Sequence, residues 1–214
     1  MKEKKDLEIE RIVVDTSKSE KDKKGDEKIL DATLRVIESH TISGTRISLI
    51  AQEADMLQSN VLYYYKNKEE ILVALQKRIL EIFPKNRMEL MENAKDSLEA
   101  KLYAFAENEI NLLEQYPEYN HAEMDFWVQS RIDEATRERF AESYELWRAN
   151  IRDILKEYCQ DIPEEMLEIL PAQYVSMLEG CTIQYLIDPK SIDLRKYFKT
   201  STDILLSALK PYTK

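Results

Sequence analysis

Residues 44–71 of this 214-residue chain read GTRISLIAQEADMLQSNVLYYYKNKEEI, and their pattern is the most informative in the sequence. Apolar residues at helical spacing predict two short helices in it, over about residues 46–54 and 58–65. Asn67 then lies three residues before Glu70, a capping-box spacing that predicts the start of a longer helix. Two short helices followed by a long one are therefore expected in this part of the chain.

The amino-acid composition favours an all-α fold. Only 3 Gly and 6 Pro are present, whereas an average chain contains roughly 7% Gly and 5% Pro, so few residues are available for tight hairpin turns. The three glycines, Gly25, Gly44 and Gly180, lie too far apart to form a glycine-rich phosphate loop or a dinucleotide-binding fingerprint. ATPase and Rossmann-type functions are therefore excluded.

Helical spacing of apolar residues continues on both sides of the opening stretch. Upstream, a first helix is expected from Asp26 to near His40. Downstream, the longer helix is expected to stop at Pro84, because proline lacks the N–H group that a helix interior uses. Pro171 is expected either to kink or to split a later helix. Including these, about nine helices are predicted, the later ones over residues 85–115, 118–130, 133–159, 164–187 and 192–209.

Charge divides the chain into parts. Residues 1–25 alternate Lys, Glu and Asp, and we expect a disordered mixed-charge tail. Residues 1–80 hold 15 basic and 15 acidic side chains, whereas residues 81–214 hold 16 and 26, so the formal charge of -10 belongs to the second part. A nucleic acid would be bound by the first part, because phosphates require cations. Alternatively, the acidic helices only provide solubility.

A two-turn helix, a turn and a second short helix rich in Gln, Asn and Tyr have the layout of a helix-turn-helix, whose second helix lies in the DNA major groove. A more specific pattern is carried by Thr45, Ile50-Ala51, Ala54, Tyr63-Tyr64-Tyr65 and Lys66-Asn67-Lys68 before Glu-Glu-Ile. In this pattern the chain resembles the tetracycline-repressor (TetR) family. The resemblance covers about residues 26–80 and implies a helix-turn-helix DNA-binding domain there, followed by a helical effector-binding and dimerisation domain over 81–214.

The chemistry of this segment suits a DNA interface. Gln58, Ser59 and Asn60 begin the second short helix, and Gln or Asn amides bond bidentately to adenine, each good pair giving ~1–3 kcal/mol of discrimination. Three consecutive tyrosines cannot all face inward on a helix, so Tyr65 is expected in the core and the other two outside. The residues expected to contact DNA, some from the resemblance alone, are Thr45, Arg46, Ser48, Gln58, Ser59, Asn60, Tyr63, Tyr64, Lys66 and Lys68.

Three positions depart from the family pattern. Asp55 stands where the family usually has the turn glycine, although Asp tolerates left-handed backbone better than most residues. Leu57 replaces the usual Ser cap of the recognition helix, and Leu62 replaces a Tyr that contacts the DNA backbone. The recognition helix is therefore expected to begin without a side-chain cap and to lack one phosphate contact.

The resemblance implies that the C-terminal helices bind a small-molecule effector and pair as a homodimer through residues 164–187 and 192–209. A twofold dimer suits two DNA half-sites one helical turn apart. Residues expected to seal the dimer, or else to belong to the core, are Met177, Leu178, Ile183 and Leu205. Residues expected in the effector pocket, with the core again the alternative, are Phe105, Asn108, Glu109, His121, Met124, Phe126, Trp127, Tyr144, Trp147 and Tyr174. An acidic, aromatic cavity suits a lipophilic cation.

Two other function classes are weighed against a regulator. An enzyme with a helical di-iron centre needs two Glu-x-x-His motifs, and the chain has only Glu118-x-x-His121. No metal, cofactor or catalytic residue is therefore expected. The second alternative is a helical interaction module with a degenerate DNA-binding domain, to which the changes at positions 57 and 62 point. The expected function is a ligand-responsive regulator, and the resemblance implies a repressor rather than an activator.

Neither the cysteines nor the apolar runs suggest a special environment. Cys159 and Cys181 form no Cys-x-x-Cys motif and are expected to be buried thiols. No apolar run approaches the ~18 residues of a membrane span, and the N-terminus lacks the apolar stretch of a signal peptide. A cytoplasmic location without membrane contact is the expectation.

Overall fold

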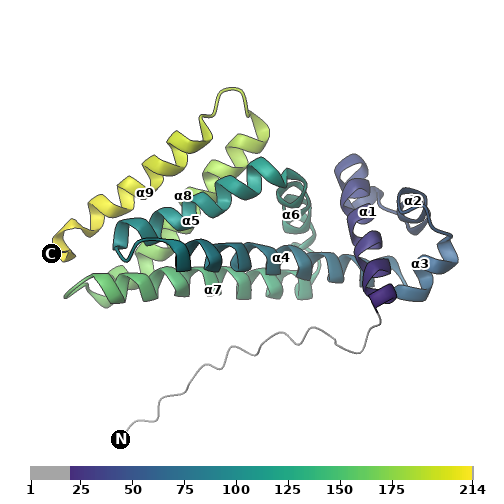
Figure 1. Cartoon of the computed structure of the whole chain (residues 1–214), viewed down its shortest axis with the longest axis horizontal. Helices are drawn as coiled ribbons and strands as arrows, with labels where there is room; N and C mark the ends of the chain where they lie inside the picture. The colour runs from purple at the N-terminus through teal and green to yellow at the C-terminus, as the bar shows by residue number, and fades with distance from the viewer. Residues whose placement is uncertain (1–19, 214) are drawn as a thin grey trace, which may run out of the picture.

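A computed structural model describes residues 20–213, and every regular element in this part of the chain is a helix, as predicted. Four helices begin the described chain, and the first three form one end of the molecule (Figure 1). They are α1 (Glu20–Gly44), α2 (Ile47–Glu53), α3 (Gln58–Tyr64) and α4 (Lys68–Asn93). Five more α-helices and a short 3₁₀ turn follow: α5 (Leu98–Gln115), α6 (Pro117–Gln129), α7 (Glu134–Tyr158), α8 (Glu164–Ile187), α9 (Leu194–Leu209) and η1 (Lys210–Tyr212).

The N-terminal helices pack around a shared apolar core. Ile29 of α1, Ile50 of α2, Val61 of α3 and Ile71 of α4 are all fully buried in it. The predicted cap of α4 is present, because the Glu70 amide donates to the Asn67 side chain at 2.8 Å. The core therefore holds α2 and α3 against α1 and against the first turn of α4, which fixes how α3 is presented.

Helix α1 is longer than the sequence predicts. It begins at Glu20, so residues 20–25 of the predicted tail are helical, and residues 1–19 lie outside the described residues. Gly25 packs against Tyr64 of α3, where a Cβ atom would lie 2.2 Å from the tyrosine hydroxyl. At its other end the regular helix stops near His40, as predicted, because Thr41 has a positive φ of 58°. The N-terminal turns of α1 thus contribute to positioning α3.

The prediction that a helix stops at Pro84 is wrong. Helix α4 continues through Pro84 to Asn93, and the break falls instead before Ser97, whose side chain accepts from the Ala100 amide and caps α5. The predicted single helix over residues 85–115 is consequently divided between α4 and α5. Proline removes one hydrogen bond but does not end a helix that packing holds on both sides. Pro171 does not split α8 either.

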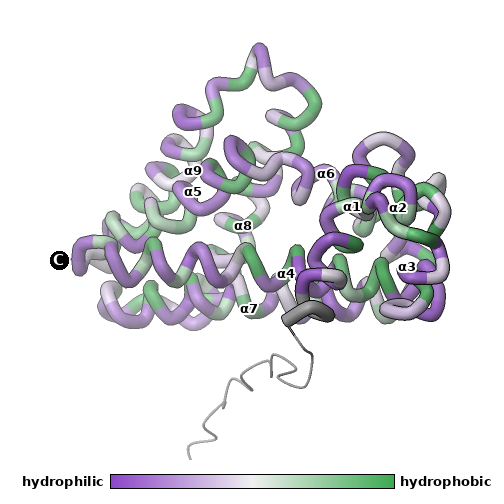
Figure 2. Tube along the Cα trace, turned by 45° about the vertical axis from the view of Figure 1, so that its right-hand side comes forward, coloured by the Kyte–Doolittle hydropathy of each residue, from purple (hydrophilic) through white to green (hydrophobic). Residues whose placement is uncertain are grey.

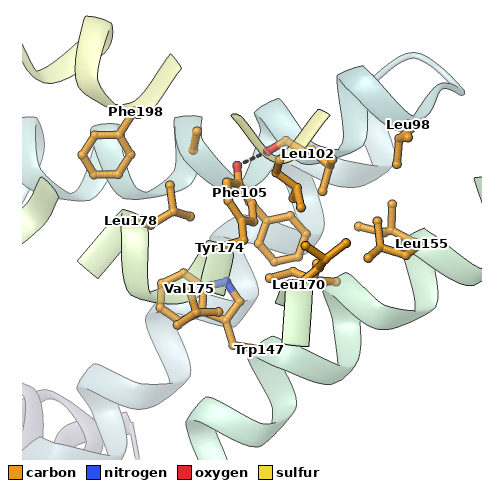
Figure 3. Close-up of a cluster of buried hydrophobic side chains, with 14 of the residues drawn as sticks. Leu98, Leu102, Phe105, Trp147, Leu155, Leu170, Tyr174, Val175, Leu178 and Phe198 are labelled. Atoms are coloured by element: carbon orange, nitrogen blue, oxygen red, sulfur yellow. Dashed lines mark hydrogen bonds between the residues drawn. The ribbon is translucent and has the colours of Figure 1, made fainter. Parts of the chain in front are cut away.

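The C-terminal helices form a second apolar core between α5, α7, α8 and α9. Figure 3 shows its centre, where the Tyr174 hydroxyl points to the backbone carbonyl of Leu102. The two oxygens are 2.9 Å apart, and the same hydroxyl lies 2.8 Å from the Thr202 hydroxyl. Figure 2 shows apolar residues recurring along these helices between polar stretches, as amphipathic packing requires. Cys159 and Cys181 are free thiols buried in this core.

Helix α6 connects the two cores. Its Asp125 accepts a hydrogen bond from the Ile42 amide at 2.8 Å, and its Tyr119 hydroxyl accepts one from Arg78 of α4, also at 2.8 Å. Arg78 in turn forms a 2.6 Å ion pair with Asp31 of α1. These polar contacts tie the N-terminal helices to the rest of the molecule. No helix between residues 20 and 213 has the length and apolarity needed to cross a membrane.

Candidate functional site

The outer surface of α3 carries the polar side chains that the sequence singles out. Gln58, Ser59 and Asn60 are exposed, while Val61 faces the core and is fully buried. Tyr63 is 78% exposed on the same helix. Arg46, Ser48 and Lys66 are exposed on the neighbouring segments. Amide and hydroxyl groups are therefore exposed on α3, here called the α3 surface, and hydroxyl and cationic groups are exposed on the segments that adjoin it in the chain. This is the chemistry of a groove-reading helix with phosphate contacts beside it.

The turn between α2 and α3 has the geometry of a helix-turn-helix. Asp55 adopts a positive φ of 46°, the left-handed conformation expected at this position. The Met56 amide donates to the Ala51 carbonyl at 2.9 Å and closes the turn. Leu57 precedes α3 without any side-chain cap, as predicted, and is 71% exposed. The turn is thus formed without its usual glycine, and α3 begins without a cap.

Three of the predicted DNA contacts have side chains engaged elsewhere. Thr45 is only 2% exposed and its hydroxyl donates to the Thr41 carbonyl at 2.8 Å, so its side chain is not available to a phosphate. Tyr64 is half-buried against Gly25. The Lys68 ammonium donates to the Ile42 carbonyl at 3.3 Å. Tyr65 is buried, as predicted, and its pKa is raised by burial and by the Asp26 carboxylate.

A second site lies in the C-terminal part, where five helices enclose a small cavity of about 20 Å³. This inner cavity is about large enough for one water molecule. Its lining combines three carboxyl groups, one guanidinium and three aromatic rings. The lining residues are Pro84 and Arg87 on α4, Glu109 on α5, Glu123 on α6, Phe140, Ser143, Tyr144, Leu146 and Trp147 on α7, and Glu179 on α8.

The aromatic wall of the inner cavity is a ladder along one face of α7. Tyr144 and Trp147 stack with ring centroids 6.4 Å apart and planes 7° apart, and Phe140 continues the stack at the same spacing. The guanidinium carbon of Arg87 lies 4.4 Å from the centroid of Trp147 and 4.9 Å from that of Phe105. A cation is therefore already held between two aromatic faces at cation–π distance.

Burial shifts the pKa values of the charged groups around the inner cavity. Glu109 and Glu123 are 5% and 9% exposed, and burial raises the pKa of both carboxyls. Burial, with the Glu109 charge, raises the pKa of Glu179 to about 8. The pKa of Arg87 is lowered because its guanidinium is buried, although the Glu109 carboxylate 3.6 Å away opposes this effect. One guanidinium thus faces three carboxyl groups, so a further cation would be needed to balance all three in their ionised forms.

The structure brings only part of the predicted effector pocket together. Glu109, Tyr144 and Trp147 line the inner cavity, and Phe105 flanks it through Arg87. Asn108 is buried beside Glu109 and donates to it at 3.2 Å, but does not line the cavity. The remaining five predicted residues do not line it either: His121, Met124, Phe126, Trp127 and Tyr174.

The predicted pocket residues that do not line the inner cavity make contacts elsewhere in the fold. His121 lies 4.0 Å from Glu38 of α1 at the surface. Phe126 and Trp127 pack with the N-terminal core, and Tyr174 belongs to the C-terminal core. An aromatic residue at helical spacing satisfies a core as well as a cavity, so its type alone does not distinguish the two roles.

Sequence reasoning missed Arg87, Glu123 and Glu179. A usable signal exists for Glu179, because it is the one charged residue in residues 169–187 of α8 and lies four residues after the buried Val175. A carboxyl group on the inner face of a helix needs a partner or a function. Arg87 offers no such signal, since its segment alternates charged and apolar residues.

A wider surface groove of about 510 Å³ lies between α4, α5 and α9. Its two cations are already paired, Arg195 with Glu107 and Glu114, and Lys199 with Asp203. Both cations of this groove therefore already have carboxylate partners within the chain. Among the described residues, no group of His, Cys, Asp and Glu is arranged to hold a metal ion.

Helices α8 and α9 present an outward face of apolar and small residues. Leu178 and Leu205, which the sequence offers for a dimer, are buried in this chain's own core instead. The outward face, here called the α8–α9 face, consists of Ile169, Gln173, Ser176, Gly180 and Ile187 on α8 with Tyr197, Thr200, Ile204 and Ala208 on α9. A Cβ atom at Gly180 would have nothing within 4 Å, so another helix has room to approach closely there.

Two family models match the chain. One, described as bacterial regulatory proteins of the tetR family, matches residues 29–75. The other, described as the C-terminal part of a BetI-type transcriptional repressor, matches residues 98–209. Among curated proteins, the HTH-type transcriptional regulator BetI of Burkholderia mallei is 22% identical over 187 residues, which cover 86% of this chain and 92% of that protein.

Solved structures share the fold. A transcriptional regulator from Rhodococcus sp. Rha1 has a TM-score of 0.74 at 16% identity, covering 86% of this chain and 95% of its own. A putative transcriptional regulator from Saccharomonospora viridis, solved in complex with choline, has a TM-score of 0.75 at 15% identity, covering 86% and 96%. Because the model over residues 98–209 spans more than half of the sequence and a second covers the helix-turn-helix, this chain belongs to the TetR family of DNA-binding, ligand-responsive transcriptional regulators.

Proposed function

We propose that this chain is a homodimeric repressor whose affinity for DNA falls when a small organic cation binds in the inner cavity. The observation that carries the proposal is the excess of carboxyl groups over cations there. Glu109, Glu123 and Glu179 face one guanidinium, and the rings of Tyr144 and Trp147 stand beside them. A ligand cation pairs with these carboxyl groups in their ionised form and gains cation–π contact with the rings.

The relatives support this class of ligand. The Saccharomonospora viridis regulator was solved with choline, a quaternary ammonium compound, and shares the fold of this chain. Aromatic rings with nearby carboxylates are the usual means of recognising such cations, because the charge is diffuse and offers no hydrogen-bond donor. A carboxylate pair without rings would suit metal ions or amines instead.

The DNA side of the proposal rests on the exposed α3 surface. We assign base reading to Gln58, Ser59 and Asn60, and phosphate contacts to Arg46, Ser48, Tyr63 and Lys66. The α8–α9 face would pair two copies, so that two α3 helices reach half-sites about one helical turn apart. The effector acts if it binds more tightly to an arrangement in which the two α3 helices no longer match that spacing.

The test uses purified protein and the intergenic DNA that flanks its gene. Binding is followed by fluorescence anisotropy while choline, or its neutral isostere 3,3-dimethylbutan-1-ol, is added. We expect choline to release the DNA and the isostere, which has the same shape without the charge, to have at least tenfold less effect. Glu123→Gln should weaken the response to choline without changing the affinity for DNA in its absence. Equal responses to both compounds would refute the cation proposal.

A further inference from the structure

The Arg87 guanidinium already makes the kinds of contact that a bound organic cation would make. It lies between the rings of Phe105 and Trp147, at 4.9 and 4.4 Å from their centroids, and it faces the Glu109 carboxylate. The side chain is only 3% exposed. Trp147 and Glu109 are also among the groups proposed above to recognise the ligand. Two cations cannot use the same ring faces at the same time.

The guanidinium is held more loosely than most buried arginines. Its nearest approach to Glu109 is 3.6 Å, longer than a hydrogen bond, and its Nε has no hydrogen-bond partner among residues 20–213. A buried arginine normally uses its planar fork in bidentate hydrogen bonds. The Arg87 guanidinium would therefore lose few hydrogen bonds if it moved away from Glu109 and the two rings.

The volume of the inner cavity leads to the same conclusion. Only about 20 Å³ is free, whereas cavities that hold small molecules measure roughly 300–1,000 Å³. A ligand must therefore displace something. Of the lining side chains, Arg87 is the long flexible one that lies against the rings, so its movement frees both the space and the cation-binding surfaces together.

We infer that Arg87 is an internal competitor of the effector: the cation binds by displacing the guanidinium from between Phe105 and Trp147 and takes its place beside the three carboxyl groups. This inference rests on the function proposed above. The effector binds only when the Arg87 guanidinium is away from Phe105 and Trp147. The measured association constant is therefore the intrinsic one multiplied by the fraction of molecules in that state. Arg87 thus sets the effector concentration to which the protein responds.

The first experiment removes the competitor. The full chain carries Arg87→Ala together with Trp127→Phe, so that Trp147 is the remaining tryptophan, and tetramethylammonium is titrated against its fluorescence. We expect tetramethylammonium to bind at least tenfold more tightly than to the Trp127→Phe parent. Arg152→Ala, which removes a cation from α7 outside the inner cavity, is the matched control and should leave the affinity within twofold of the parent.

A general electrostatic effect is separated from competition by a second probe. N-Ethylguanidinium reproduces the missing end of the side chain, so it should bind the Arg87→Ala protein and exclude tetramethylammonium. Simultaneous binding of the two probes would overturn the inference while leaving the proposed function intact. If tetramethylammonium binds neither protein, both the inference and the proposed cation response fail.

A measurement on the wild-type chain does not depend on the variant folding. In protein labelled with ¹⁵N-arginine, the Arg87 Nε–H signal, assigned by its absence from Arg87→Lys, belongs to a buried group. Saturating tetramethylammonium should move it to the position of exposed arginines and accelerate its exchange with water. A signal that stays unchanged at saturation would contradict displacement.

Discussion

The Ile42 amide donates a 2.8 Å hydrogen bond to the Asp125 carboxylate, and this contact joins the end of α1 to α6. Two residues earlier on α6, Glu123 lines the inner cavity. Residues two apart on a helix point in nearly opposite directions, about 200° around the axis. One helix therefore faces the proposed effector on one side and the DNA-binding helices on the other.

Asp125→Ala should reduce the communication between the two sites. The variant loses the carboxylate that holds the Ile42 amide, a hydrogen bond to a charged group of about 1.5–3 kcal/mol. We expect choline to bind as before, while the ratio of DNA affinities without and with saturating choline falls roughly tenfold. Asp125→Asn keeps one acceptor oxygen and should retain most of the ratio. An unchanged ratio in the alanine variant would exclude this contact as a route of coupling.

Base reading and phosphate contact should respond differently to substitution on the α3 surface. Asn60→Ala is expected to weaken binding to the preferred DNA by about 1–3 kcal/mol and to relax base preference. Lys66→Ala is expected to weaken binding to all sequences and to lower the slope of log K against log salt by about one. Salt titrations on specific and scrambled DNA measure both effects. The same loss on every sequence from both variants would refute the division of roles.

Effector affinity should rise with pH. Burial, together with the Glu109 charge, raises the pKa of Glu179 to about 8, and Glu123, Arg87 and Tyr144 also face it across the inner cavity. A bound cation favours the ionised carboxyl, so binding below pH 8 releases a proton, and affinity should increase up to tenfold per pH unit between pH 6 and 8. Calorimetry in two buffers measures the proton release.

Glu179→Gln tests the assignment of that proton. The variant should lose up to one released proton and show a flatter pH profile. The pH dependence of the free energy of unfolding tests the same pKa shift independently. A carboxyl whose pKa is raised in the folded state binds more protons in that state than in the unfolded state. The free energy of unfolding should therefore decrease from about pH 4.5 to pH 8 in the wild type, and less steeply in the variant. Identical profiles for both proteins would assign the proton elsewhere.

A charge on the α8–α9 face should prevent pairing. Ile204 is 54% exposed on α9, and Ile204→Glu would place a carboxylate in an apolar contact. We expect a monomer by sedimentation at micromolar concentration, with DNA affinity reduced because one α3 helix binds alone. Ile132 is 85% exposed at the turn between α6 and α7, so Ile132→Glu is the matched control and should remain dimeric. Dimers of both variants would place the interface elsewhere.

Tyr174→Phe separates the core from the inner cavity. The change removes the hydroxyl that contacts the Leu102 carbonyl and the Thr202 hydroxyl. Because these partners are buried, we expect a loss of about 1–3 kcal/mol in the free energy of unfolding. Choline affinity should stay within twofold, since Tyr174 does not line the inner cavity. Chemical denaturation measures the free energy of unfolding, and calorimetry measures the affinity for choline. A large loss of affinity would indicate that Tyr174 contributes to the ligand site.

Local signals in the sequence predicted most of the fold. The short helices α2 and α3 and the cap at Asn67 are specified by residues that are close in the chain, so spacing alone identifies them. The end of α4 was misplaced because proline has a strong local preference, whereas the continuation of the helix through Pro84 depends on packing from distant segments.

The inner cavity was harder to predict than the α3 surface. Its lining comes from five helices that are far apart in the sequence, and no spacing rule connects Arg87 with Glu123 or Glu179. The exposed residues of α3 lie within a single motif, so their shared surface follows from the helical period. Residue type alone selects Glu109, Tyr144 and Trp147, which line the inner cavity, but it also selects core residues such as Tyr174.

Pro84 removes one backbone hydrogen bond from the interior of α4. A proline nitrogen carries no hydrogen, so one i to i−4 hydrogen bond of α4 is absent there. This point borders the inner cavity and lies one turn before Arg87. A helix bends most easily at such a point. The part of α4 before Pro84 begins directly after α3, the DNA-reading helix. A displacement caused by a bound molecule would therefore change the angle between the two parts of α4 at Pro84, rather than bend the helix along its whole length.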